Sequence, residues 1–526
     1  MRKFLMLVAS VTALLPALAQ AAPNSFDLVL RSRVATEENS VRYHAVLEQQ
    51  SWKATETAVI VCDMWDLHHC LNATRRGAEL APRMNALLKK ARAQGATIIH
   101  APSSCMKPYA NHPGRKRAMA APMASKLPEK ISEWCYSIPS EEEVEYPIDQ
   151  SDGGEDDDPV EHEAWAKELE SKGLNPRGPW TKQTDLLTIK NQDYISDSGV
   201  EIWNVLEQKG IKNVILVGVH TNMCVLGRPF GLRQMAQNGK NVVLVRDMTD
   251  TMYNPKMKPY VSHFTGTDLI VEYIEKVVCP TVTSDQILGG KPFVFKNDTR
   301  PHVVIACAER EYKTNESLPR FALEQLGNDF KVSFVHANAN ERNDLPGIGV
   351  LEDADVLLVS VRRRVLPADQ FAIVERFIKS GKPVIGIRTA NHAFSLRGED
   401  PPSGYKAWEA FDAEIFGGSY TGHHGVGPNV KLVAAKPHPI MTGVDVNTFK
   451  GMGSLYKVNP LSKGTTPLLT GTIEGQPAET IAWVNETKYG GKAFYTSLGH
   501  VDDFTQPAMN RLLKNAILWA VDKEIK

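Results

Sequence analysis

The sequence predicts an α/β protein built from two doubly wound, mostly parallel three-layer α/β/α domains in tandem. Short apolar runs of strand length alternate with amphipathic segments of helix length. The alternation stops near residue 280 and begins again at residue 301, and 526 residues are too many for one ordinary core. We therefore expect domains at residues 50–280 and 301–526, with a linker rich in Gly and Pro at residues 281–300.

In the first half, a β-α-β pattern predicts a parallel sheet. The expected strands are 57–63, 97–100, 184–190, 213–219 and 241–247. The expected helices are 75–94, 199–209, a segment ending at 238–239, and 267–278. Residues 23–52 are polar and we expect them to be irregular. An acidic stretch at about 139–163 has little apolar content and predicts a solvated insertion, and it lacks the spacing of an EF-hand calcium loop.

The second half repeats this pattern without a sequence repeat. Strands are expected at 302–306, 331–335, 355–359 and 383–388, and helices at 318–326, 367–380 and 506–521.

Residues 1–22 have the features of a secretory signal peptide: a basic start, an apolar run and small residues before the expected cleavage site. No cysteine follows the run, which argues against a lipid anchor, so we expect a periplasmic or secreted protein. An odd number of cysteines, seven, leaves at least one without an intramolecular partner. Sixty basic and 61 acidic residues nearly cancel, which argues against nucleic acid as a partner and favours a small molecule; an oligomer remains open.

The chain contains a candidate nucleophile, Cys224, where a buried strand passes into an expected helix. Unpaired N–H groups and the positive end of a helix favour a thiolate and can hold an oxyanion. The alternative is a cysteine that packs as a small buried hydrophobe. Pro229 and two nearby glycines also weaken the helix.

Three residues of complementary chemistry, Asp63, Lys190 and Cys224, follow three expected parallel strands. Ligands of open α/β sheets bind at the carboxyl ends of the strands. Asp63 could take the thiol proton and return it to a leaving amine, and Lys190 would keep both groups ionised. Backbone N–H groups of His220 and Cys224 would bind the oxyanion.

Three segments together resemble the isochorismatase-like cysteine hydrolase family, over about residues 50–280. They are residues 59–66, the segment ending at Lys190, and residues 218–225 (Gly-Val-His-Thr-Asn-Met-Cys-Val). The resemblance implies that Asp63, Lys190 and Cys224 form a catalytic triad. It also implies a cis peptide at Val219–His220.

The substrate pocket would include Trp65, where the family commonly has glutamine, and also Asp66, His100 and Thr221, although Thr221 could instead only shape the turn. Residues 101–105 replace the segment that supplies a histidine in metal-binding nicotinamidases, so we expect neither a metal nor a cofactor.

Residues 302–520 resemble the trehalose-utilisation (ThuA-like) family, whose fold is related to class I glutamine amidotransferases; the matching stretches include 308–315, 381–388, 417–424, 438–444 and 494–500. Arg388 occupies the turn that carries the amidotransferase nucleophile and cannot attack. The remaining polar residues suit a hydroxyl-rich, carbohydrate-like ligand, unless they are scattered structural groups. These residues are Glu309, Arg388, His392, His423, His424 and His500.

We therefore expect an exported hydrolase that cleaves a C–N bond of a small amide, with a second domain that binds or processes a carbohydrate-like ligand. One alternative is vinyl-ether hydrolysis of the isochorismatase type, with Asp63 as the acid. Another is a carbohydrate-binding protein with a relict triad.

Overall fold

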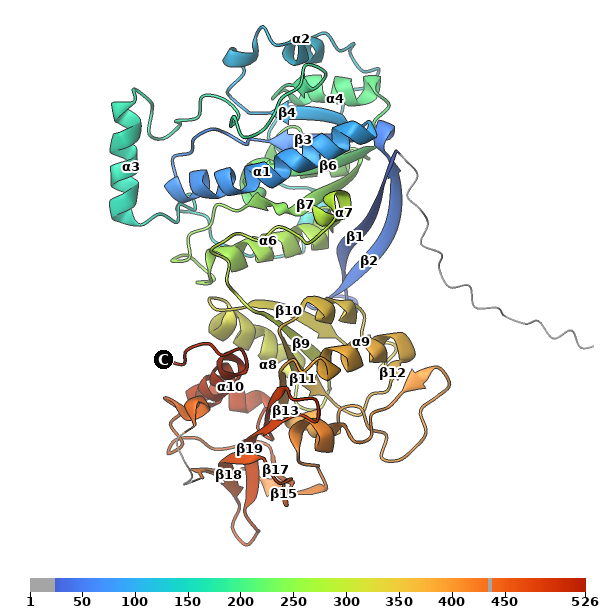
Figure 1. Ribbon diagram of the computed structural model, residues 1–526, viewed down its shortest axis with the longest axis vertical. Helices are drawn as coiled ribbons and strands as arrows, with labels where there is room; N and C mark the ends of the chain where they lie inside the picture. The colour runs from blue at the N-terminus through green and yellow to red at the C-terminus, as the bar shows by residue number, and fades with distance from the viewer. Residues whose placement is uncertain (1–23, 434–437) are drawn as a thin grey trace, which may run out of the picture.

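The computed structural model describes residues 24–433 and 438–526, so the expected signal peptide at residues 1–22 lies outside the described residues. The described residues form two α/β units that follow one another along the long axis of the molecule (Figure 1). In the described part of the chain, no helix is long and apolar enough to cross a membrane.

The first unit contains an eight-stranded sheet with the order β2-β1-β8-β7-β6-β3-β4-β5. Six strands from β8 to β5 are parallel, and β1 and β2 are antiparallel at one edge. The strands are β1 (Ser25–Ala35), β2 (Tyr43–Lys53), β3 (Thr57–Cys62), β4 (Thr97–Ala101), β5 (Tyr194–Ile195), β6 (Asn213–Val219), β7 (Asn241–Asp250) and β8 (Thr281–Val282). The helices are α1 (Leu71–Gln94), α2 (Pro113–Met119), α3 (Pro159–Ser171), α4 (Gly199–Gln208), α5 (Leu232–Gln237), α6 (His263–Val277) and α7 (Asp285–Leu288).

Helices cover both faces of this sheet. Apolar residues of α4, α5 and α6 pack on one face and those of α1 and α7 on the other. The central strands β3 and β6 are buried along their whole length, which explains why their sequences are continuously apolar.

Three predictions for this unit were wrong. Residues 25–53 form the long β1–β2 hairpin, whose alternating residues Phe26, Leu28 and Leu30 are buried. The expected strand 184–190 lies in loops and turns, because only Leu187 of its apolar residues is buried strongly. Part of the expected linker, β8 and α7, completes the first unit.

The second unit contains a sheet with the order β10-β9-β11-β13-β20-β19-β18-β16, parallel from β10 to β20 and antiparallel beyond. Its strands are β9 (His302–Ala308), β10 (Lys331–His336), β11 (Val356–Val361), β13 (Val384–Ile387), β16 (Asn429–Leu432), β18 (Thr466–Thr472), β19 (Glu479–Glu486) and β20 (Lys492–Thr496). Two small sheets pair β12 (Leu366–Pro367) with β14 (Tyr405–Lys406) and β15 (Gly422–Val426) with β17 (Ser454–Lys457).

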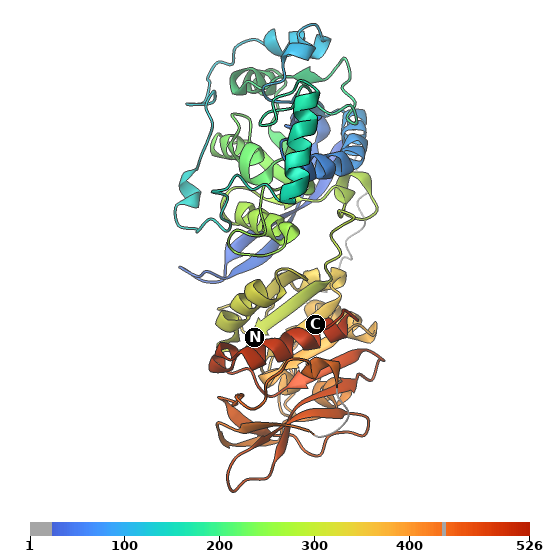
Figure 2. The same cartoon turned by 90° about the vertical axis from the view of Figure 1, so that its left-hand side faces the viewer.

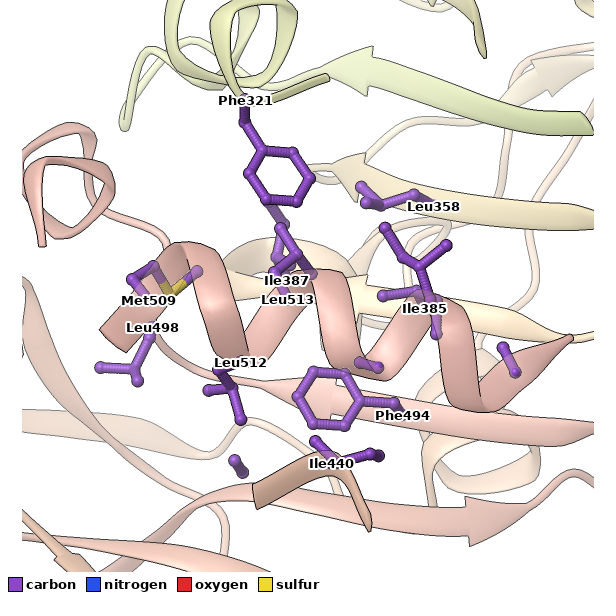
Figure 3. Close-up of a cluster of buried hydrophobic side chains, with 14 of the residues drawn as sticks. Phe321, Leu358, Ile385, Ile387, Ile440, Phe494, Leu498, Met509, Leu512 and Leu513 are labelled. Atoms are coloured by element: carbon purple, nitrogen blue, oxygen red, sulfur yellow. The ribbon is translucent and has the colours of Figure 1, made fainter. Parts of the chain in front are cut away.

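Helices α8 (Thr314–Phe321), α9 (Ala368–Lys379) and α10 (Pro507–Ala520) complete this unit. Figure 3 shows α10 lying along one face of the sheet, with Leu512 and Leu513 packed among side chains from β11, β13 and β20. Apolar residues of α9 pack on the opposite face. The predicted fold class, two parallel-dominated α/β domains in tandem, is confirmed.

Candidate active site

Asp63 lies at the carboxyl end of β3 and is fully buried. Its backbone has a positive φ of 45°, a conformation that L-residues adopt uncommonly outside functional sites and turns. Its Oδ1 accepts a hydrogen bond of 2.7 Å from the backbone N–H of Ser103, in the loop after β4. Two adjacent parallel strands therefore fix this carboxylate at the ligand-binding edge of the sheet.

Cys224 lies just after β6, the neighbouring strand, and its side chain is almost buried, with 8% exposed. Residues Thr221–Val225 form a single π-helical turn, a distortion often found at functional sites. The peptide Val219–His220 is cis, as the family resemblance implied. The sulfur lies close enough to the Asp63 carboxyl and to the backbone of His220 to interact with both.

Arg228 lies one helical turn after Cys224, and its Nε donates a hydrogen bond of 2.9 Å to Oδ2 of Asp63. Its guanidinium lies over the ring of Trp134, 5.2 Å from the ring centroid. Gly227 permits this packing, since a Cβ there would lie 2.4 Å from Nε1 of Trp134. Cys224 and Arg228, four residues apart on one helical face, therefore both contact Asp63.

Burial raises the pKa of Asp63, and Arg228 and the Ser103 N–H oppose that effect. Burial, followed by the negative charge of Asp63, raises the pKa of Cys224 well above its usual range. The resting site therefore contains a neutral thiol beside a carboxyl group whose ionisation depends on Arg228. This arrangement suits transfer of the thiol proton to Asp63 during attack, rather than a preformed thiolate.

Lys190 does not lie in this site. Its side chain is exposed, and the ion pair on Asp63 comes from Arg228. The sequence placed Lys190 at the end of a strand, but the strand in this part of the sheet, β5, begins four residues later and is followed by Ser196, Asp197 and Ser198. The described structure has no lysine at the carboxyl end of β5.

An aromatic wall stands beside Asp63. Trp65 stacks on Trp180 with 4.6 Å between ring centroids, and its Nε1 donates to the carbonyl of Ser103. His68 continues the wall and meets the ring of His220 edge-on at 4.7 Å. Burial lowers the pKa of His220 to about 4, so this histidine is neutral at pH 7.

The other predicted pocket residues have structural partners. Asp66 accepts backbone hydrogen bonds from Thr181 and Lys182 and so holds the loop that carries Trp180. The ring of His100 is fully buried between Gln183 and Asp193. Thr221 is also fully buried, and its hydroxyl bonds to Thr249 and to the carbonyl of Asp250, so it shapes the turn.

A buried ionic network that the sequence did not reveal lies next to His220. Arg76 of α1 bridges Asp156 and Asp250, both at 2.7 Å, and His263 contacts the same two carboxylates. The acidic insertion was predicted to be solvated, but the side chain of Asp156 is only 8% exposed. That prediction was wrong at Asp156, which the buried cation Arg76 neutralises, whereas most other residues of the insertion are exposed or half-buried.

One group of residues in this network has the atoms of a metal site. Cys70, Asp156 and Asp157 place one potential ligand atom each within 4.8 Å of one another. However, Asp157 accepts the N–H groups of Leu71 and Asn72 at the start of α1, and the thiol of Cys70 donates to both carboxylates. The group therefore acts as a helix cap.

In the second unit, Arg388 stands at the turn after β13 but is buried as a structural clamp. Its guanidinium lies between the rings of Tyr312 and Tyr456, at 4.4 and 4.3 Å from their centroids. It also donates to the backbone carbonyls of Ser454 and Ser497. These contacts leave it little freedom to bind a ligand.

Two of the histidines predicted for the second pocket pack against the same two tyrosines. The ring centroid of His392 lies 6.1 Å from that of Tyr456, and the ring centroid of His500 lies 6.1 Å from that of Tyr312. The carboxylate of Glu309 accepts hydrogen bonds from the backbone N–H groups of residues 311, 312 and 314. His424 lies 3.5 Å from Glu479, and His500 caps a short helical turn. His392 and His423 line a common cavity of about 580 Å³. Its other lining residues are Arg363, Ser395, Arg397, Asp412, Tyr420, Thr421, Gly422 and Lys457.

Comparison with known proteins agrees with this two-part organisation. Residues 154–258 match the family model of the isochorismatase domain, and residues 302–520 match that of trehalose utilisation, ThuA. The chain is therefore similar to the isochorismatase family in its first unit and to the ThuA family in its second. The match to the isochorismatase model includes Cys224 and Arg228, whereas Asp63 lies before it.

Solved structures similar to the chain include members of both families. A ThuA-like protein from Bacteroides uniformis is 17% identical, with 45% of this chain and 97% of that chain covered and a TM-score of 0.34. A cysteine hydrolase from Pseudomonas syringae pv. phaseolicola is 16% identical, with 45% and 92% covered and a TM-score of 0.27. An isochorismatase family protein from Burkholderia thailandensis is 14% identical, with 44% and 93% covered and a TM-score of 0.25. No curated protein matches the chain.

Proposed function

We propose that the isochorismatase-like domain hydrolyses a C–N bond of a small amide through a covalent Cys224 intermediate. The observation that carries the proposal is the contact of one buried carboxylate, Asp63, with both the Cys224 thiol and the Arg228 guanidinium. Arg228 takes the role that the family resemblance gave to Lys190. An arginine remains charged in a buried site, so it can hold Asp63 ionised at neutral pH.

In the proposed reaction, the sulfur of Cys224 attacks the amide carbon while Asp63 takes the thiol proton. Backbone N–H groups at His220 and Cys224 receive the charge that develops on the carbonyl oxygen. The C–N bond then breaks, Asp63 returns the proton to the leaving amine, and a thioester remains. Water attacks the thioester with Asp63 again as the base, which releases the acid and restores the thiol.

The test is a panel of small amides with ammonia or amine release as the readout, followed by Cys224→Ala on any amide that is cleaved. Cys279→Ala is the matched control, because both cysteines are 8% exposed and Cys279 lies outside the site. The proposal predicts loss of hydrolysis in Cys224→Ala only, and an acyl adduct on the Cys224 peptide after rapid quenching. Full activity in Cys224→Ala would contradict covalent catalysis.

One observation favours a second candidate function, vinyl-ether hydrolysis. The pKa values of both Asp63 and Cys224 are raised, so a protonated Asp63 could act as the acid without any thiol chemistry. This reaction would survive Cys224→Ala and be lost in Asp63→Asn, which separates it from amide hydrolysis.

We propose that the ThuA-like domain binds a carbohydrate-like ligand in the cavity of about 580 Å³ lined by His392 and Tyr420. Ring faces and polar side chains suit a hydroxyl-rich molecule. The lining contains three basic residues, Arg363, Arg397 and Lys457, and one carboxylate, that of Asp412. This excess of positive charge favours an acidic sugar over a neutral one. Binding of glucuronate but not glucose, measured by calorimetry and weakened by Lys457→Met, would support this assignment; preference for glucose would contradict it.

We also propose that the protein is exported, on the signal-like composition of residues 1–22. A mature N-terminus near residue 23, measured by mass spectrometry of the expressed full chain, would support this. An intact N-terminus in a cytoplasmic fraction would contradict it.

A further inference from the structure

A second cavity lies between the two units, and Glu309, which the sequence predicted for the second pocket, is one of its lining residues. It has a volume of about 320 Å³ and is lined by the tip of the β1–β2 hairpin and by the carboxyl ends of β9 and β10. Figure 1 shows the hairpin extending from the first sheet toward β10. We call this space the hairpin cavity. Its volume lies at the lower end of the range for small-molecule sites, about 300–1,000 Å³.

The position of the hairpin cavity follows from the sheet topology. The chain passes from β9 to β10 on one side of β9 and then to β11 on its other side. The crevice at such a reversal of strand order, outside the carboxyl ends of the strands, is where open α/β sheets bind ligands. In this protein the tip of the hairpin of the first unit, which Figure 2 shows on the side of the first unit that faces the second, also lines that crevice.

The decisive residue in the cavity is Arg364, which follows β11 and is only 5% exposed. Its Nε is buried without a hydrogen-bond partner, and its Nη1 donates only to the carbonyl of Arg362. Among the described residues, no carboxylate forms an ion pair with it. Desolvation and the neighbouring charges of Arg342, Arg310 and Arg362 lower its pKa to about 10, so it still carries its charge at pH 7.

The acidic residues near Arg364 are already engaged. Glu309 also lines the cavity, but its two oxygens accept hydrogen bonds from the segment that begins α8. Glu37, on the hairpin, pairs with Arg42 at 2.8 Å. A buried cation without an anionic partner is costly. A ligand with several negative oxygens would supply that partner.

Two further groups could receive parts of such a ligand. Arg310 lines the cavity from the end of β9 and has an exposed side chain. His336, at the end of β10, is 6% exposed, and its Nδ1 has no partner. Burial lowers the pKa of His336 to about 4, so its neutral ring can donate to or accept from a ligand atom.

We propose that the hairpin cavity binds the phosphate group of a small phosphate monoester, held by Arg364 and Arg310 from the second unit and by Arg42 from the first. The planar fork of arginine matches phosphate oxygens, and the volume leaves room for a small organic part. Because both units contribute arginines, the ligand would also fix the hairpin against the second unit.

The test uses the full chain with inorganic phosphate and glycerol phosphate as probes, in isothermal titration calorimetry at constant ionic strength. We expect saturable binding of one phosphate group per chain, at least tenfold weaker in Arg364→Met and in Arg42→Gln. Arg42 is partly exposed on the hairpin, so Arg42→Gln tests the site without disturbing the buried core. The control is Arg376→Gln, which should retain binding, because Arg376 is exposed and pairs with Glu352.

Hydrogen exchange of residues 36–42 provides a second readout, because bound phosphate should slow exchange in the hairpin tip. The proposal is overturned if no saturable binding occurs, or if all three variants bind equally well. It is also overturned if Arg42→Gln retains full affinity, since the hairpin would then take no part.

Discussion

The Nε of Arg228 lies 2.9 Å from Oδ2 of Asp63, so the cation of the candidate site comes from the same helical turn as the cysteine. Asp63 is fully buried and Arg228 is 22% exposed on its side chain, so the pair is only weakly screened by water. The charge on Arg228 therefore controls the ionisation of the group that would accept the thiol proton.

Arg228→Met should lower kcat/KM on any cleaved amide by about 10²-fold, the lower end of the contribution of general base catalysis. Without the cation, burial would raise the pKa of Asp63 further, and the acidic limb of the pH–rate profile should move to higher pH. Arg228→Lys should restore part of the activity and of the profile.

Lys190→Met is the matched comparison for Arg228→Met. It also removes one positive charge, but from the residue that the sequence predicted as the cation of the triad. We expect its activity to equal that of the wild type, because Lys190 is exposed and Asp63 is paired with Arg228. A large loss in Lys190→Met with none in Arg228→Met would show that the lysine serves the site.

Asp250→Asn should destabilise the first domain by about 3 kcal/mol at pH 7, because it removes one partner of buried Arg76. Burial alone would raise the pKa of Asp250, but Arg76 and His263 outweigh burial and hold it well below its usual range. The ion pairs of Asp250 therefore stabilise the folded domain at pH values above the pKa of an unfolded Asp, about 3.9. This stabilisation is lost as the pH falls through the lower pKa that Asp250 has in the folded protein.

Thermal unfolding of wild type and Asp250→Asn at pH 7, 4 and 2.5 checks this prediction. The difference between them should be large at pH 7 and shrink toward pH 2.5. Asp185→Asn, at a carboxylate that is 81% exposed, should show little difference at any of these pH values. A constant difference for Asp250→Asn across the series would argue against the ionic network.

Arg388→Lys should destabilise the second domain by about 3 kcal/mol, since a lysine cannot stack between Tyr312 and Tyr456 and also reach the carbonyls of Ser454 and Ser497. The measurement is the melting transition of this domain by calorimetry. Arg376→Lys, on the exposed face of α9, is the control. Unchanged stability with altered sugar binding would instead return Arg388 to the ligand pocket.

The sequence predicted the features that depend on continuous apolar runs. Strands β3 and β6 are buried on both faces, so their hydrophobic pattern located Asp63 and Cys224 at one edge of the sheet. The prediction from sequence failed where the hydrophobic pattern is short or mixed with polar residues. Strand β5 has two residues, Tyr194 and Ile195, and an apolar loop before it imitated a strand ending in Lys190.

Arg228 could have been found from the sequence. It follows Cys224 by four residues, which places the two side chains on one face of a helical turn. The buried network of Arg76, Asp156 and Asp250 could not have been found in this way, because its members lie more than 70 residues apart and only tertiary packing brings them together. An acidic run with little apolar content does not indicate which of its carboxylates will form ion pairs with buried cations.

The rate at which Cys224 reacts with iodoacetamide, measured against pH by mass spectrometry of its peptide, tests most directly whether Asp63, Cys224 and Arg228 form one electrostatic unit. In the wild type we expect slow reaction at pH 7 and an apparent pKa above the value of about 8.5 for a free cysteine. Asp63→Asn should lower this pKa and speed the reaction at pH 7, and Arg228→Met should raise it, while Cys279 should respond to neither change. Identical profiles for Cys224 in all three proteins would contradict the account.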